Sequence, residues 1–226
     1  ILSSIGIMIS GERTSFAFLI MASVYLGVML QINTKHLLMS VFVFVSTILL
    51  FIYSNSSVKY RLIDFTKKQI NLTNEENLTF FSKEHEGHYL AALDIFKSNK
   101  ILGIGPKNFR NYCYNNKKYA KEPFVCSSHP HNTYIQLLAE TGIVGLVSIL
   151  FIFLLITYYS IKHFYLRYKK KIYLFNNTQI SLIVAMTITT WPLIPSGSFF
   201  NNYLNIIYFF PVGIFLWLQD SLLKNK

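Results

Sequence analysis

Two histidines stand directly before a long uncharged stretch of the chain, and this junction is the part of the sequence best suited to chemistry. His129 and His131 are followed, over residues 141–161, by an apolar run without charge. Such a run is long enough to cross about 30 Å of hydrocarbon. Histidine titrates close to neutral pH and can exchange a proton during a reaction. We therefore predict that His131 lies near the mouth of a membrane-spanning helix, in an active site at a membrane surface.

Arginines supply a second kind of candidate. Arg13 stands at the start of an apolar run, and Arg110 lies in the long polar segment before His131. A guanidinium group binds phosphate through two parallel hydrogen bonds and keeps its charge, which suits it to hold an anionic substrate. Each arginine also has a structural interpretation: Arg13 as an anchor at a helix end, and Arg110 as a solvated surface charge.

The neighbours of His131 also admit two kinds of role. His131 and His129 fit a proton acceptor with its supporting partner, or groups that only orient the next helix. Asn132 fits either a helix cap or a group that orients reactants. Glu140 is the acid closest in sequence, and it suits either a partner of the imidazole or a charge near a helix N-terminus. The chain contains no Asp-x-Asp pair for a divalent ion, so we predict chemistry without a metal or other cofactor.

Cys113 and Cys126 are the only cysteines, and both precede His131. In an oxidising compartment a disulfide between them would close a short loop and contribute about 3 kcal/mol in the chain-entropy model. The alternative is a pair of unlinked, small hydrophobic residues. Their spacing to the two histidines differs from that of common zinc sites, which contain closely spaced cysteines.

The elements that position these residues follow from composition. Hydrophobic residues make up 52% of the chain and charged residues 14%, which indicates an integral membrane protein. We expect an all-α fold with about five transmembrane helices. The apolar runs that predict them are residues 14–31, 37–53, 141–161 and 172–219, the last divided by Pro192, Pro195 and Gly197.

Charge asymmetry orients the predicted helices. Basic residues cluster in short loops on one side, which the positive-inside rule makes cytoplasmic. The chain then has three parts: an N-terminal membrane part at 1–53, a large extracytoplasmic loop at 54–132, and a C-terminal membrane part at 133–226. A helix is predicted within the loop at 84–98, because apolar residues recur there at helical spacing. Residues 1–10 resemble the end of another apolar segment, so a longer protein is expected.

The net charge of +11 does not require a nucleic acid partner. It divides between the orientation signal and a basic outer face, and the second part favours an anionic substrate such as a phosphorylated lipid. Residues 191–202 interrupt the last apolar run with small polar and aromatic residues. This segment fits either a sugar-binding lip opposite His131 or a tight turn between helices.

Three motifs together resemble the O-antigen ligase and O-antigen polymerase superfamily. They are Gly-Glu-Arg-Thr-Ser at 11–15, Leu-Gly-Ile-Gly-Pro-Lys-Asn-Phe-Arg at 102–110, and His131-Asn132 followed after nine residues by Gly142-x-x-Gly145. Leu146 and Val147 replace the two threonines that end the last motif in many ligases. The resemblance covers nearly the whole chain and corresponds to the C-terminal half of family members, with their catalytic loop.

The resemblance implies an inverting, metal-independent glycosyltransferase of a bacterial inner membrane, with its large loop in the periplasm. The donor would be a glycan linked to undecaprenyl diphosphate, and the acceptor a hydroxyl of another glycan or of the lipid A core. His131 would be the catalytic base, and the substrate-binding residues would be Arg13, Arg110, His85, His129 and Asn132. His85 stands near a position where many members carry arginine. A polysaccharide transporter and a noncatalytic membrane assembly protein are the alternatives.

Overall fold

The computed structural model describes residues 2–10, 12–30, 32–69, 83–119, 125–193 and 195–224. All regular structure within these ranges is helical, which confirms the predicted all-α fold. The chain separates into two compact units, Ile1–Phe80 and Phe81–Lys226. The division falls inside the predicted outer loop, within residues 70–82, which lie outside the described ranges.

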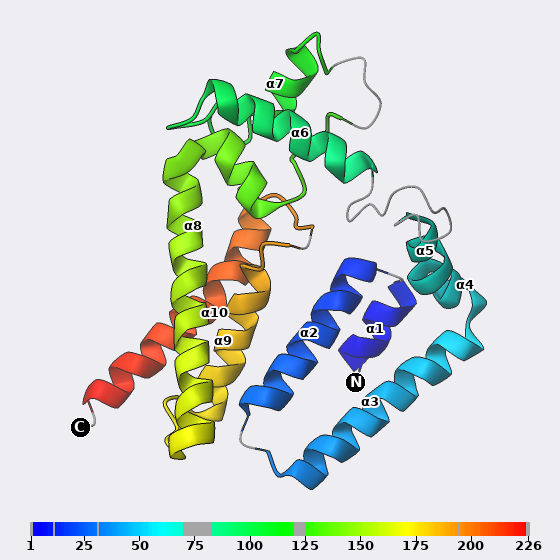
Figure 1. Ribbon diagram of the computed structural model, residues 1–226, viewed down its shortest axis with the longest axis vertical. Coiled ribbons are helices and arrows are strands. Elements are labelled where there is room, and N and C mark those ends of the chain that lie inside the picture. Colours follow the sequence, from blue (N-terminus) through cyan, green and yellow to red (C-terminus); the bar gives the residue numbers. More distant parts are fainter. Residues whose placement is uncertain are drawn as a thin grey trace. The chain divides into compact units, whose positions relative to one another are not determined.

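The first unit contains two apolar helices that agree with the first two predicted runs. They are α2 (Arg13–Met29) and α3 (Thr34–Ser54), and they run in opposite directions (Figure 1). Asn33 begins α3 as a helix cap, because its side-chain oxygen accepts the Lys35 N–H at 2.9 Å. The remaining elements are α1 (Leu2–Ser10), α4 (Ser56–Lys59), the π-helical turn η1 (Tyr60–Asp64) and α5 (Phe65–Gln69).

The second unit carries the predicted site residues other than Arg13. Its elements are α6 (Lys83–Ser98), α7 (Phe109–Asn115), α8 (Thr133–Tyr165), η2 (Leu166–Lys170), α9 (Asn177–Thr189) and α10 (Asn202–Lys224). Helix α9 packs against α8 and against α10, and α6 crosses the bent end of α8 (Figure 1). The helix predicted at 84–98 is thus confirmed as α6. Its buried face carries Ala91, Ala92 and Ile95, which pack against Ala139 of α8.

Helix α8 bends sharply at Gly142, which has φ 66° and ψ −158°. Residues 133–141 form a short arm and residues 143–165 a long apolar arm, and Figure 1 shows the bend between them. Both arms were expected to form one continuous path from His131 into the membrane. The candidate span still begins at Thr133, two residues after His131, and the position of His131 near the mouth of a membrane-spanning helix stays a prediction.

Two helices within the described ranges are long and apolar enough to cross a membrane. They are Thr34–Ser54 and the helical stretch Thr133–Lys170, which includes the bend at Gly142. Helix α2 is apolar but has 17 residues. Helix α9 has 13 residues and rises about 20 Å, less than the roughly 30 Å of a bilayer core. The predicted break in the last run is confirmed between α9 and α10, whereas the number of five spans stays a prediction.

Candidate functional site

Four of the six histidines come together in the second unit. His85 and His88 lie one turn apart on α6, where residues three apart share a face. His131 is central: its ring centroid lies 4.1 Å from that of His129, 5.4 Å from His88 and 5.6 Å from His85. We call these four residues the histidine cluster. The sequence analysis included three of them as site residues and missed His88, although its spacing from His85 was a usable signal.

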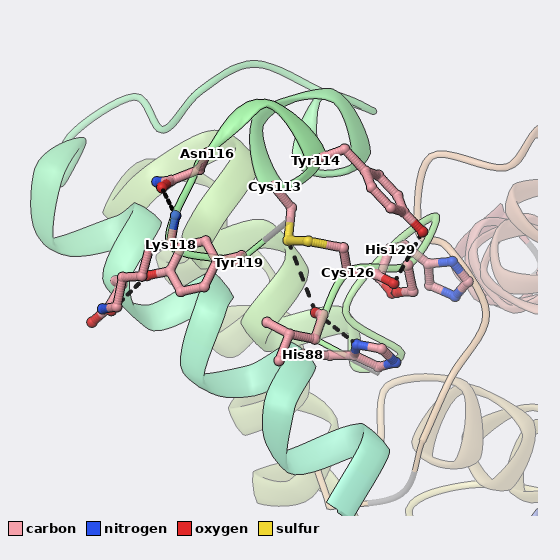
Figure 2. The surroundings of a disulfide bond; sticks show 11 residues. His88, Cys113, Tyr114, Asn116, Lys118, Tyr119, Cys126 and His129 are labelled. Carbon is pink, nitrogen blue, oxygen red and sulfur yellow. Dashed lines mark hydrogen bonds and ion pairs between the residues drawn. A yellow bond between two sulfur atoms is a disulfide. The ribbon is translucent and has the colours of Figure 1, made fainter. Parts of the chain in front are cut away.

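The carbonyl group of Val125 fixes the position of His88. Nδ1 of His88 lies 3.0 Å from this oxygen, and because a carbonyl only accepts hydrogen bonds, Nδ1 carries the proton. Nε2 is then the nitrogen that remains able to accept a proton. The disulfide lies on the other side of the same carbonyl, with Sγ of Cys113 3.9 Å from the oxygen (Figure 2).

Cys113 and Cys126 are joined by a disulfide with a Cα–Cα distance of 5.7 Å. It links α7 to the segment that leads into His129 and His131, and the Tyr114 hydroxyl donates to the Cys126 carbonyl at 3.3 Å beside it (Figure 2). The sequence analysis considered either a bridge or two unlinked cysteines. The structure has the bridge, and it restrains the backbone that carries half of the histidine cluster.

The backbone at His131 is held in a left-handed conformation, with φ 58°. This conformation is uncommon for residues other than glycine. The His131 carbonyl accepts the Ser196 N–H at 2.8 Å, which ties His131 to the connection between α9 and α10. This hydrogen bond therefore holds the backbone that carries the His131 ring.

Asn132 acts as a cap and as a tether. Its side-chain oxygen accepts the N–H groups of Tyr134 and Ile135 at 3.0 and 3.1 Å, which begins α8. Its amide group donates to the Pro192 carbonyl at 2.8 Å. The oxygen and the nitrogen of the Asn132 side chain thus both make hydrogen bonds within the protein. Asn132 is a helix cap, one of its two predicted roles, and it also positions the 191–201 connection.

The short arm of α8 holds this connection at further points. Thr133 pairs with the Ser196 hydroxyl at 2.9 Å, and Gln136 donates to the Ser198 hydroxyl at 3.0 Å. The Phe199 N–H donates to Oε1 of the Gln136 side chain at 2.9 Å. The segment that was interpreted as a sugar-binding lip or a tight turn is therefore held beside His131 by hydrogen bonds to α8. Its role toward sugars stays a prediction.

Glu140 is fully buried and does not serve His131 as a hydrogen-bond partner in the described part of the chain. One carboxylate oxygen accepts the Phe109 N–H at 2.9 Å, at the start of α7. The other accepts the Gln136 amide at 2.9 Å. The interpretation as a charge near a helix N-terminus thus applies to α7, a helix that is distant in sequence.

Exchanging Glu140 for glutamine should destabilise the second unit by about 1–3 kcal/mol. A glutamine at position 140 has one side-chain oxygen, so only one of the two donors, the Phe109 N–H or the Gln136 amide, keeps an acceptor. The Gln136 side chain cannot rotate to compensate, because its own oxygen accepts the Phe199 N–H. The double variant Gln136→Glu with Glu140→Gln restores one acceptor between the two side chains and should recover most of the loss. Thermal unfolding in detergent measures both. Equal stability of Glu140→Gln and the parent protein would contradict this network.

Two glycine motifs meet at the bend of α8. The Ile104 and Gly105 N–H groups donate to the carbonyls of Ala139 and Glu140 at 3.1 and 2.8 Å, and the Ile143 N–H donates to the Lys100 carbonyl at 2.9 Å. We call these three hydrogen bonds the backbone clasp. They satisfy backbone groups that the bend removes from the helix.

The clasp brings two backbones so close that only glycine fits at the contact. A Cβ atom on Gly142 would overlap the Ile101 carbonyl, and one on Gly103 would overlap the backbone of Glu140 and Thr141. Both residues also have positive φ, 66° and 65°. Gly103 and Gly142 therefore allow the close backbone contact that holds the short arm of α8, which begins next to His131.

Electrostatics keep His131 uncharged at neutral pH. Burial lowers the pKa of His131 to about 4, and the neighbouring His129, His88 and His85 add to the lowering because like charges repel. Burial likewise lowers the pKa of His129, against a smaller opposing effect of the Ser196 backbone. A neutral imidazole can accept a proton, which general-base chemistry requires.

The other predicted residues lie apart from the histidine cluster or in the other unit. Arg110 is exposed on α7. Arg13 begins α2 in the first unit, where its guanidinium carbon lies 5.0 Å from the centre of the Phe65 ring. Asp94, which has no acidic neighbour in sequence, is held by Lys118, by Tyr119 at 2.6 Å and by Lys97 at 2.9 Å. These partners keep the pKa of Asp94 below its ordinary value.

Within the described ranges, no group of His, Cys, Asp and Glu side chains has an arrangement that would hold a metal ion. Imidazole rings can exchange protons near neutral pH and can donate hydrogen bonds to an anion when protonated.

Comparison with known proteins agrees with the motifs at the site. The family model described as O-antigen ligase matches residues 1–150, which include the glycine motifs at 103–105 and 142–145 and all four histidines of the cluster. No curated protein matches the chain. Because the family model covers well over half of the sequence, the chain belongs to the O-antigen ligase family.

Proposed function

We propose that the protein is a membrane glycosyltransferase of the O-antigen ligase or polymerase type, which moves a glycan from undecaprenyl diphosphate to an acceptor hydroxyl. One observation carries the proposal beyond family membership: His131 is half-buried, uncharged at neutral pH, and locked by its backbone against the 191–201 connection. This is the state in which a histidine can take a proton from a sugar hydroxyl.

The proposed reaction is a single displacement. The acceptor oxygen attacks the anomeric carbon of the donor sugar, the bond from that carbon to the diphosphate oxygen breaks, and the acceptor proton passes to a ring nitrogen of His131. The diphosphate leaves as an anion and needs no proton, so one base suffices. Attack from the face opposite the leaving group inverts the anomeric centre. No step requires a metal ion, because cationic side chains can hold the diphosphate charge.

The proposed substrate-binding residues divide between the units. His85 and His129 flank His131 directly, whereas Asn132 positions the 191–201 connection. Arg13 and Arg110 remain proposed diphosphate ligands, since a guanidinium binds phosphate oxygens in pairs. For Arg110, exposure on α7 leaves its head group accessible to a ligand.

A lipid donor fits an apolar groove between α8, α9 and α10. The groove has a volume of about 570 Å³. It begins at Thr133 and Phe199, next to the segment that binds His131, and extends to Leu216 and Gln219 near the end of α10. We propose that part of the undecaprenyl chain occupies it, with the diphosphate at the histidine end. We also propose that the protein lies in a bacterial inner membrane with the histidine cluster on the periplasmic side.

The glycan profile of cells that lack the protein tests the proposal. A polymerase predicts loss of chain length in the surface polysaccharide. A ligase predicts intact lipid-linked polymer that never reaches the lipid A core. Complementation with the parent gene should restore the profile, and complementation with a His36→Ala gene serves as a control because His36 is exposed in α3, outside the proposed site. An unchanged glycan profile in the deletion strain would contradict both forms of the proposal.

A further inference from the structure

One face of α7 is rich in asparagine. Asn108, Asn111 and Asn115 recur with Tyr112 at spacings of three and four residues, and such spacings place side chains on the same side of a helix. Together with Asn116 they line a pocket of about 410 Å³. The described lining of this pocket therefore consists of four amides and one aromatic ring.

Two of these asparagines have no local structural role. The side chains of Asn111 and Asn115 are exposed and make no hydrogen bond within the described part of the chain. Asparagine disfavours a helix interior, because its side chain competes for backbone hydrogen bonds. Helix α7 tolerates it because the disulfide at Cys113 and the buried ring of Phe109 hold the helix in place. Residues that work against local propensity in this way are typical of functional positions.

The other two asparagines each use only one end of the side-chain amide. Asn108 donates to the Ile104 carbonyl at 2.9 Å, and Asn116 accepts the Lys118 N–H at 3.0 Å. The oxygen of Asn108 and the nitrogen of Asn116 therefore remain for a ligand. The four amides together supply both donors and acceptors, which matches hydroxyl groups, since each hydroxyl both donates and accepts.

A second pocket, of about 280 Å³, adjoins the first, and Tyr112 and Asn116 line both. Its polar centre is Asp94 of α6, whose carboxylate accepts hydrogen bonds from Lys97, at 2.9 Å, and from Lys118. An ammonium group has three N–H donors. Both lysines therefore keep donors beyond the one that each directs at Asp94.

The two pockets are separate from the histidine cluster. No residue of that cluster is among the described residues that line them, and Figure 2 shows Asn116, Lys118 and Tyr119 on one side of the disulfide, with His88 and His129 on the other. A ligand in these pockets therefore does not occupy the proposed reaction centre.

We propose that the two pockets form an accessory glycan site, in which a short oligosaccharide packs against the Tyr112 ring while its hydroxyls bond to the amides and to the lysine ammonium groups. A pyranose ring suits this lining, because it has a face of C–H groups and an edge of hydroxyls, and tyrosine offers a rigid apolar face. The pocket volumes lie near the lower end of the range for small-ligand sites. That the glycan is a substrate of transfer rests on the proposed function, whereas glycan binding itself does not.

The accessory glycan site predicts an effect that depends on glycan length. A glycan whose reacting end lies at His131 reaches this site only through its distal sugars, so a short substrate leaves the site empty. Tyr112→Ala should therefore raise KM for long glycans about 2- to 10-fold, the loss expected for one aromatic contact. It should leave kcat unchanged, as loss of uniform binding does. KM for a substrate with a single sugar should equal that of the parent.

The direct test measures binding of oligosaccharides to the full chain in nanodiscs. The probes are the glycan released by mild acid from the cells' own undecaprenyl diphosphate, and the core oligosaccharide released from their lipid A. We expect saturable binding of at least one probe, weakened about 2- to 10-fold in Tyr112→Ala and retained in Tyr112→Phe, which keeps the ring. The probe that binds more tightly shows whether the site serves the donor or the acceptor. No saturable binding of either probe would overturn the proposal.

Asn111→Ala separates ligand binding from folding. Alanine favours a helix more than asparagine does, so this variant should be at least as stable as the parent and should still lose affinity. Lys117→Ala is the control from the same segment, because Lys117 is exposed after α7 and lines neither pocket; its affinity should equal that of the parent. Unchanged affinity in both Asn111→Ala and Tyr112→Ala would show that the probes bind elsewhere and that the proposal is wrong.

The accessory glycan site and the proposed function can fail separately. Binding that depends on Tyr112, in a protein that transfers no glycan, would leave the site in place and refute the proposed function alone. Glycan transfer by Tyr112→Ala with the parent's KM for long glycans, together with unchanged probe affinity, would refute the accessory glycan site alone.

Discussion

His131→Ala is expected to lower glycan transfer by a factor of about 100 to 10,000, the range that general-base catalysis supplies. The variant removes the imidazole that we propose accepts the acceptor proton, and it leaves the proposed diphosphate-binding arginines in place. The measurement is single-turnover transfer by purified protein from undecaprenyl-diphosphate-linked glycan, with a chelator present. Because the backbone at position 131 has positive φ, a His131→Asn variant, which tolerates that conformation better than alanine, separates loss of the base from backbone strain.

His36→Ala is the control for this experiment, because His36 is exposed in the first unit. Its activity should equal that of the parent. Activity in His131→Ala within twofold of the parent would show that another group removes the proton. Loss of the parent's activity on addition of the chelator would show that the proposed metal-free reaction is wrong.

The pH profile of the parent protein gives a further check on the base. His131 must be unprotonated to act, so kcat/KM, which reports on the free enzyme, should fall as the pH drops through about 4. The profile of kcat reports on the substrate complex, and its acidic limb should lie at higher pH if a bound anion raises the pKa of His131. Coincident limbs would mean that the donor does not alter the base.

Gly142→Ala is expected to destabilise the second unit by about 2–6 kcal/mol, the sum of strain from positive φ and of overpacking, each about 1–3 kcal/mol. The new methyl group would overlap the Ile101 carbonyl, which is backbone and cannot rotate away. The expected result is loss of the backbone clasp. Hydrogen exchange at the Ile104, Gly105 and Ile143 amides reports this directly, because these three groups donate its bonds.

Gly105→Ala separates the two contributions. Gly105 also has positive φ, 97°, but no atom lies within 4 Å of the position its Cβ would take. The variant should therefore show only the strain, about 1–3 kcal/mol. If Gly142→Ala proves no more destabilising than Gly105→Ala, close approach of the two backbones does not explain the glycine at position 142.

Elements that depend on local sequence were predictable. The apolar runs gave the positions of α2, α3 and the long arm of α8, and the amphipathic spacing gave α6. The prolines at 192 and 195 placed the break before α10 correctly, because a proline lacks the N–H that a helix needs. In each case the signal and the structure that it specifies lie within the same twenty or so residues.

Features that depend on distant contacts were not predictable in this way. The bend at Gly142 lies in an uncharged run that predicts a straight helix, and the partners that stabilise it are provided by residues 100–105. Glu140 was judged by its closeness to His131 in sequence, yet one of its two partners is the distant Phe109 N–H and the other is Gln136. The histidine cluster likewise joins α6 to a segment about 40 residues later, a pairing that no local pattern specifies.

The backbone clasp can form only after residues 139–143 have been synthesised. The turn that donates the Ile104 and Gly105 N–H groups leaves the ribosome roughly 40 residues before the Ile143 amide, a delay of about 2–8 s at typical elongation rates. During this interval Ala91, Ala92 and Ile95 of α6 have no Ala139 against which to pack. The buried face of α6 can therefore reach its packed state only after the following helix has been made.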